Sequence, residues 1–232
     1  MIQDNVTLDE VNQVCNARYP VIKDTSAFKN NQWQAEKMAA SLEKRLAKRE
    51  GGREEYNQEV QDFLDRKVIR VVTQEEIRAW ELKGGKVNFV SHHAVERPDK
   101  ATTKLRLVSN SSLKNSGRGP SPNSVWPKGP FGGGLQPLHE VLLRFRSYEV
   151  ALHSDLTKMF HSVRTGPEEM FMRLMVWRAT ENDDWVVYGF LVVTFGDRPA
   201  TCITSHCLNL AAEAGRLLDP KAALCPQKRH LL

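Results

Sequence analysis

Helical periodicity first appears between residues 32 and 50. Apolar residues recur there at spacings of three and four, with charges on the opposite face: Ala35, Met38, Ala39, Leu42 and Leu46. This spacing predicts an amphipathic helix. The glycines of EGGREE end it, and a similar pattern predicts a second helix at about 54–67. The residues before position 32 are mixed and polar, so we expect a linker with YPVIKD as an apolar anchor.

A short strand, VIRVV, precedes a strong helix-start signal at Thr73. Glu76 follows three residues later, and this pairing is typical of a capping box. Val72 and Ile77 stand at the positions of a hydrophobic staple around the same start. A helix beginning after Thr73 is therefore predicted.

The period changes to two from residue 86 onward. KVNFVSHHAV and TKLRLVSN both alternate, and the polar ERPDKATT separates them. This arrangement predicts a β-hairpin, with Leu105 and Leu107 on one strand face and Lys104 and Arg106 on the other.

Residues 114–137 are rich in Gly, Pro and Ser, which predicts a long loop that is functional or mobile. PLHEVLLRFRSY then has helical periodicity, and VALHSD is an apolar stretch that predicts a strand ending near Asp155. A helical turn containing Pro167, a strand, a further strand at 185–196 and a helix beginning near Pro199 complete the prediction. Because hairpins rather than helical crossovers join the strands, the expected fold class is α+β.

Composition and charge exclude few classes of protein. The chain has 232 residues, a formal charge of +5, a pI near 9.0 and 41% hydrophobic residues, which permits an anionic partner without requiring one. The first residues lack an apolar signal core, and the longest apolar run, WVVYGFLVVTF, is too short to span a bilayer. We therefore expect an intracellular protein, cytoplasmic or nuclear, with no membrane partner. The four cysteines match no zinc spacing and are interpreted as free thiols.

Three local patterns could carry chemistry, and each has an ordinary structural alternative. Asp155 after an apolar stretch is either a metal ligand or a helix cap or salt-bridge partner. Lys104 and Arg106 on one strand face suit a triphosphate, or form a solvated surface. Gly196, shortly before a helix start, allows an anion or nucleotide to approach the backbone, or simply makes a turn.

The order of these motifs resembles the reverse transcriptase region of BEL/Pao-type LTR retrotransposon polyproteins. LRFRSYEVALHSDLTKMFHSV is similar to the first catalytic motif of that family, and VVTFGDRPA to the substrate motif that follows it. YNQEVQDFLDRKVIRVVTQEE, SHHAVERPDKATTKLRLVSNSS and SPNSVWPKGPF resemble its fingers, and YPVIKD with NNQWQAEKMAASLEKRL resembles the segment before the polymerase.

The resemblance implies a role for seven residues. In the palm motif, Asp155 would bind catalytic Mg²⁺, Leu156 would offer its backbone carbonyl to one metal, and Phe160 would select deoxynucleotides. The remaining four would contact the incoming nucleotide. Lys104 and Arg106 would bind its triphosphate, and Phe195 and Gly196 would pack behind the nucleotide and the template base. The implied partners are an RNA or DNA template-primer and a dNTP.

The chain departs from the family at the second catalytic motif, a hairpin with Tyr-x-Asp-Asp. After Gly196 the acids are Asp197, Glu213 and Asp219, and none forms an Asp-Asp pair. One carboxylate does not hold two divalent ions, so we expect a truncated polymerase that is inactive alone. The alternative is a non-catalytic nucleic-acid- or partner-binding protein derived from a retroelement.

The resemblance also suggests a division of the chain. Residues 1–50 would be an N-terminal linker and amphipathic helix, and 51–149 a fingers-like region. Residues 150–215 would be a partial palm, and 216–232 a short divergent tail.

Overall fold

A computed structural model describes residues 5–96, 105–129, 138–147, 149–150, 155–218 and 220. The α-helices are α1 (Gln32–Leu46), α2 (Gly52–Asp65), α3 (Gln74–Leu82), α4 (Pro122–Val125), α5 (Leu138–Phe145), α6 (Pro167–Phe171) and α7 (Ala200–Ala214). The strands are β1 (Val6–Asp9), β2 (Val14–Ala17), β3 (Ile69–Val71), β4 (Ser91–Glu96), β5 (Leu105–Asn110), β6 (Val163–Thr165), β7 (Leu174–Trp177) and β8 (Val186–Phe190).

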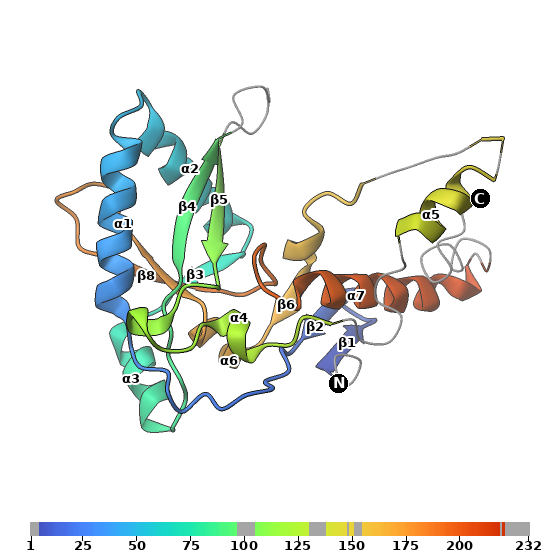
Figure 1. Cartoon of the computed structure of the whole chain (residues 1–232), viewed down its shortest axis with the longest axis horizontal. Helices are drawn as coiled ribbons and strands as arrows, with labels where there is room; N and C mark the ends of the chain where they lie inside the picture. The colour runs from blue at the N-terminus through green and yellow to red at the C-terminus, as the bar shows by residue number, and fades with distance from the viewer. Residues whose placement is uncertain are drawn as a thin grey trace.

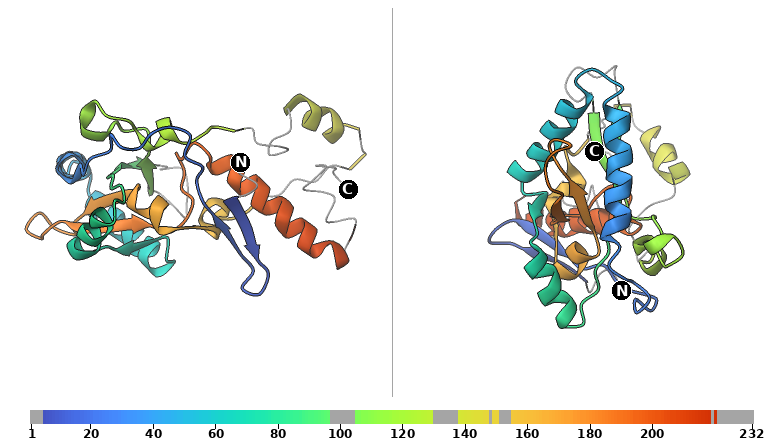
Figure 2. Two further views of the ribbon diagram at one scale, coloured as in Figure 1. Left: turned by 90° about the horizontal axis from the view of Figure 1, so that it is seen from below. Right: turned by 90° about the vertical axis from the view of Figure 1, so that its left-hand side faces the viewer.

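The described strands form three small sheets, so the α+β class is confirmed. Two sheets have three strands, in the orders β1-β2-β6 and β3-β8-β7, and the third is the β4-β5 hairpin. Figure 1 shows α1, α2 and this hairpin gathered at one side, with α7 reaching away from the other side beside β1 and β2. The left view in Figure 2 shows the same separation from below.

The helices predicted from local periodicity are confirmed. Both α1 and α2 cover the predicted ranges closely, and Ala35, Ala39, Leu42 and Leu46 are buried as the periodicity requires. Met38, predicted on the same face, is instead exposed. The α3 start is also confirmed, because Thr73 accepts from the Glu76 amide at 3.2 Å and Glu76 accepts from the Thr73 amide at 2.9 Å. These features rest on contacts between near neighbours in the chain, which is why periodicity and capping signals find them.

The predicted β4–β5 hairpin is confirmed, with a continuous antiparallel register from Ser91 opposite Asn110 to Glu96 opposite Leu105. Leu105 and Leu107 are buried and Arg106 is exposed, as the alternation predicts. Lys104 and the connecting residues lie outside the described part of the chain.

The linker predicted for residues 1–31 is wrong in part, because β1 and β2 lie within it. These strands pair antiparallel, and Asp9 closes their turn by accepting from the Val11 and Asn12 amides at 3.1 and 3.0 Å. The other edge of β2 pairs in parallel with β6, far along the chain. A pairing between such distant segments leaves little local signal.

The predicted loop at 114–137 also contains structure: a 3₁₀ turn, η2 (Asn115–Gly117), and the short helix α4. Residues 130–137 lie outside the described residues, as do 151–154, which carry most of the strand predicted before Asp155. The predicted strand at 185–196 is shorter than expected, since β8 ends at Phe190 and Val192 forms only an isolated bridge to Arg164.

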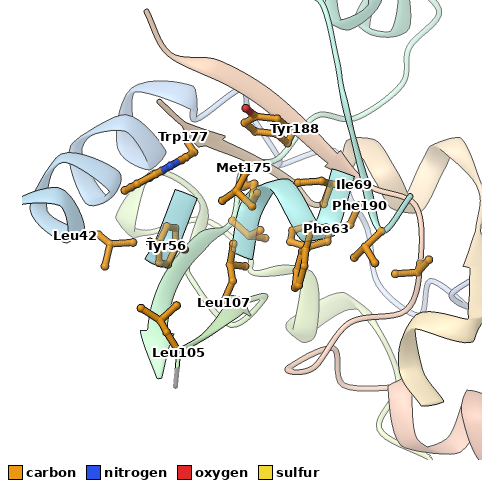
Figure 3. Packing of buried hydrophobic residues seen from close by; sticks show 14 of the residues in the cluster. Leu42, Tyr56, Phe63, Ile69, Leu105, Leu107, Met175, Trp177, Tyr188 and Phe190 are labelled. Carbon is orange, nitrogen blue, oxygen red and sulfur yellow. The ribbon is translucent and has the colours of Figure 1, made fainter. Parts of the chain in front are cut away.

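The largest described core cluster joins segments from both halves of the chain. Leu42 of α1, Tyr56 of α2, Leu107 of β5 and Trp177 of β7 all contribute buried side chains to it. Figure 3 shows these side chains converging between α1, α2, the hairpin and β8. The small sheets are therefore held together mainly by helices packed on them and by shared apolar burial.

Candidate functional site

Phe160 and Phe195, which the sequence places in separate motifs, are in contact. Phe160 lies in a 3₁₀ turn, η3 (Met159–Ser162), and Phe195 follows the last bridge after β8. Their ring centroids are 4.6 Å apart with the planes tilted by 55°. Phe195 is 45% exposed, so this aromatic pair presents a face to solvent. A planar ligand can stack on such a face.

Gly196 lets the turn after Phe195 press against β5. Its φ is +95°, and a Cβ atom there would lie 2.8 Å from the Ser109 carbonyl oxygen. Ser109 Oγ donates to the Phe195 carbonyl at 3.2 Å, and Asn123 Nδ2 donates to the Gly196 carbonyl at 2.7 Å. Glycine is needed here because any side chain would meet backbone as well as an unfavourable dihedral.

Asp197, the acid that follows, is a structural anchor for this turn. Its side chain is fully buried in an ion pair with Arg173, with 2.7 Å between Nη1 and Oδ2. Tyr19 Oη donates to Oδ2 at 2.7 Å, and Ser111 Oγ donates to Oδ1 at 2.5 Å. Protein donors thus occupy both carboxylate oxygens, which satisfies the charge in the interior.

The partners of Asp197 are themselves held in place. Arg173 also donates to the Val192 carbonyl at 2.8 Å and to Thr165 Oγ1 at 2.7 Å. Burial raises the pKa of the Tyr19 hydroxyl well above its usual value, and the nearby Asp197 charge raises it further although Arg173 opposes this. Sequence reasoning missed Tyr19 and Arg173, because their roles depend on segments distant in the chain.

His161 lies between Phe195 and the buried side chain of Phe63. Its ring lies 5.3 Å from that of Phe63 and 6.1 Å from that of Phe195, centroid to centroid. Arg66 Nη1 is 3.2 Å from His161 Nδ1, an arrangement that requires Nδ1 to be the acceptor. Burial lowers the His161 pKa to about 4, and Arg66 and Lys158 contribute to the decrease, so the ring is neutral at neutral pH. Adjacency to Phe160 was the only sequence signal for it.

Three basic residues belong to the segments that carry this aromatic group or contact it. Arg66 follows α2, Lys158 precedes η3, and Arg164 of β6 donates to the Lys67 carbonyl at 2.6 Å. Asp62 partly compensates the charge, since it accepts from Arg66 Nε at 2.7 Å. We call Phe160, His161 and Phe195 with Arg66, Lys158 and Arg164 the aromatic-basic surface.

Arg106 is exposed but faces away from this surface. Leu107 and Ser109 line a small cavity with Phe195 and His161, and strand alternation turns Arg106 to the opposite face of β5. Binding of a triphosphate by Arg106 stays a prediction. A triphosphate beside Phe195 would have to extend past β5 to meet the Arg106 side chain. Lys104, its predicted partner, lies outside the described residues.

Asp155 and Leu156 are exposed in a segment without regular structure. Among the described residues, no group of three or more His, Cys, Asp or Glu side chains is placed to hold a metal ion. Asp155 supplies one carboxylate and Leu156 one carbonyl, a set too small for the oxygen ligands that Mg²⁺ needs. The described residues thus do not by themselves form a complete magnesium site.

No disulfide joins the three cysteines that the structure describes, Cys15, Cys202 and Cys207, all of which are buried, and Cys225 lies outside the described residues. Of the described helices, none has the length and apolar character needed to cross a membrane. No protein-family model matches the chain, and a search of curated proteins also finds no match.

Proposed function

We propose that the chain is the fingers-like region and part of the palm of a retrotransposon reverse transcriptase, and that it binds nucleic acid but does not polymerise DNA alone. The proposal rests first on the order of the motifs described above. The observation that carries it is the contact between Phe160 and Phe195, at 4.6 Å between ring centroids. The resemblance assigns both residues to one nucleotide, and a nucleotide-binding role requires them to be close.

The chemistry of the aromatic-basic surface supports nucleic-acid binding. Exposed aromatic rings stack bases with little regard to sequence, and nearby cations neutralise phosphates. His161 stays neutral near pH 7, so Arg66, Lys158 and Arg164 supply the positive charge. In this proposal residues 51–149 and 150–215 would form the fingers-like region and the partial palm, with 1–50 preceding them and 216–232 following.

The absence of activity follows from the ligands that the reaction needs. Nucleotidyl transfer with two metal ions requires several carboxylates from separate segments. Asp155 is one such group, while Asp197 is fully buried with both oxygens occupied. Glu213 lies on α7 in an ion pair with Arg216, at 3.0 Å. Among the described residues, the acids of the proposed polymerase fragment therefore do not assemble a complete catalytic set.

A second candidate is a non-catalytic nucleic-acid-binding protein that uses the same surface. The aromatic-basic surface supports this candidate as much as the first, because stacking and charge need no metal. The two differ in the nucleic acid preferred. A polymerase-derived fragment should favour a primer-template junction, whereas a general binder should bind a single strand equally well.

Fluorescence anisotropy with labelled oligonucleotides tests the proposal. Phe195→Ala should weaken binding of a single-stranded oligonucleotide by about tenfold, because the stacking face is lost. Trp33→Ala is the matched control, since Trp33 is also exposed, at 59%, but lies on α1. Affinity should fall steeply with salt as counterions are released. Salt-independent binding, or equal losses in the two variants, contradicts the surface assigned here.

Primer extension tests the catalytic part. With template-primer, dNTPs and Mg²⁺, the 232-residue chain should give no product above background. Product that appears with the unmodified chain and disappears with Asp155→Asn would show that the site is complete in solution.

A further inference from the structure

A cleft separate from the aromatic-basic surface lies beside Trp80 and Trp126. Its volume is about 330 Å³, against about 10 Å³ for the small cavity beside Phe195, and the two share no lining residue. The cleft is walled by the turn after α3, the segment around Val21, the end of α4 and the start of α6. Cavities of this size hold small ligands.

Two tryptophans form walls whose positions are held by other contacts. Trp80 stacks on Phe171 with ring centroids 4.6 Å apart and planes 12° from parallel. Its Nε1 donates to the Lys86 carbonyl at 3.1 Å. Trp126 is only 2% exposed and packs edge-on against Tyr19 at 4.8 Å. Because these walls are already ordered, a ligand loses little binding energy in fixing them.

The turn after α3 brings two lysines to the rim. Gly84 has a φ of +80°, and a Cβ atom on Gly85 would lie 2.3 Å from Trp80 Nε1. The glycines therefore allow the backbone to fold tightly over the indole. As a result Lys83 and Lys86, on either side of them, both line the cleft.

The charges at the rim are arranged on two sides. Lys83 and Lys86 come from the turn after α3, and Glu168 comes from the first turn of α6. None of the three forms an ion pair within the described residues. Asp24 interacts with the Lys86 charge: hydrogen bonds from Ser26 chiefly lower the Asp24 pKa, and Lys86 adds to this. The rim thus offers cations to an anionic group and a carboxylate to a hydrogen-bond donor.

We propose that this cleft binds a nucleoside monophosphate or a ligand of the same chemistry. A flat apolar body would lie against Trp80 and the apolar side chain of Met172, its phosphate would face Lys83 and Lys86, and a hydroxyl or amino group would donate to Glu168. A phosphate binds lysine as a point charge and carboxylates accept donors strongly. This site does not depend on the proposed polymerase function, because it uses none of the residues of the aromatic-basic surface.

Isothermal titration calorimetry of the whole chain with AMP tests the proposal. The double variant Lys83→Met/Lys86→Met should weaken AMP binding by about tenfold or more, because charge-assisted hydrogen bonds to phosphate are lost. Lys37→Met/Lys44→Met, two exposed lysines of α1, is the charge-matched control and should leave affinity unchanged. Val21→Trp should also reduce binding by filling the mouth, since Val21 is 57% exposed, whereas Val11→Trp, at a 91% exposed position, should not.

Competing ligands and variants separate the outcomes. Adenosine and inorganic phosphate alone should each bind more weakly than AMP. Phosphate that binds as tightly as AMP would reduce the cleft to an ion site and overturn the proposal, as would no AMP heat at about 5 mM. AMP binding that is lost in Phe195→Ala but kept in Lys83→Met/Lys86→Met would place the nucleotide on the aromatic-basic surface instead. Failure of the oligonucleotide experiment leaves this test unaffected.

Discussion

At the scale of single residues, two buried carboxylates, Asp197 and Glu43, are paired with arginines. Arg173 and Asp197 are almost completely buried as an ion pair, at 2.7 Å. Glu43, 2% exposed, accepts from Arg53 at 2.7 Å and from Arg178 at 2.9 and 3.0 Å. Burial opposes ionisation of Glu43, but these arginines outweigh it and lower the pKa of the carboxyl. Such groups destabilise a fold strongly when only one partner is removed.

Arg173→Met should therefore lower the free energy of unfolding by about 3–5 kcal/mol, because Asp197 would keep a buried charge without its cation. Urea denaturation at neutral pH measures this. Arg216→Met is the control, because the Arg216–Glu213 pair is 49% exposed at each side chain and should change stability by less than about 1 kcal/mol. Equal destabilisation by both substitutions would contradict the assigned role of the buried pair.

At the scale of elements, the turn from Phe195 to Asp197 is fastened to β5 and α4. Ser109 of β5 holds the Phe195 carbonyl, Asn123 of α4 holds that of Gly196, and Ser111 holds the Asp197 carboxylate. The stacking face of Phe195 is therefore positioned by elements from an earlier part of the chain. Its geometry depends on how closely the Gly196 backbone approaches β5.

Gly196→Ala should cost about 1–3 kcal/mol of stability, because the positive φ is unfavourable for alanine and the new methyl meets the Ser109 carbonyl. Gly215→Ala provides the matched comparison. Gly215 has a φ of −78°, and a methyl group added there would meet nothing within 4 Å, so alanine should be neutral or stabilise by up to about 1 kcal/mol. Thermal unfolding of the two variants checks the contrast, and a tolerated Gly196→Ala would argue against the close approach.

At the scale of the whole molecule, two neutral histidines pack against one core cluster from different elements: His92 against Tyr56 and Trp177, and the partly buried His161 against Phe63. His92 of β4 is 7% exposed; its Nε2 donates to the Val176 carbonyl at 2.8 Å, while Nδ1 accepts from the Tyr56 hydroxyl. Burial lowers the pKa of His92 to about 4, as it does for His161 beside Phe195. The folded chain thus excludes protons that the unfolded chain would bind.

Stability should fall as the pH decreases from about 6.5 to about 4. In that window the histidines of the unfolded chain gain protons while those of the folded chain do not. The stabilisation that comes from the neutral histidines is therefore fully present above pH 6.5, the usual histidine pKa, and is lost as the pH falls toward about 4. His92 alone contributes on the order of 3 kcal/mol to the change. Urea denaturation at several pH values across this range measures the free energy of unfolding. That free energy should change less steeply with pH for His92→Gln than for the unmodified chain. Equal pH dependence in the two proteins would mean that folding does not lower the pKa of His92.

Sequence reasoning succeeded where the physical cause is local. The apolar face of α1, the capping box of Thr73 and Glu76, and the alternation that exposes Arg106 all involve residues a few positions apart. It failed for β1 and β2, because β2 is completed by β6, a strand that only the folded chain brings beside it. The helical periodicity of PLHEVLLRFRSY correctly predicted α5. The burial that such a pattern suggests is not found, because Leu138 and Leu142 are 71% and 47% exposed.

The amino-acid sequence by itself determined the α+β class and the positions of the main helices, whereas the site residues that it suggests by resemblance stay predictions. The tertiary structure alone decided that Phe160 meets Phe195, that Asp197 pairs with Arg173, and that a second cleft forms beside Trp80. The physical reason is that periodicity and caps arise from nearest neighbours along the chain. Burial, ion pairing and cavities depend on which distant segments exclude water together.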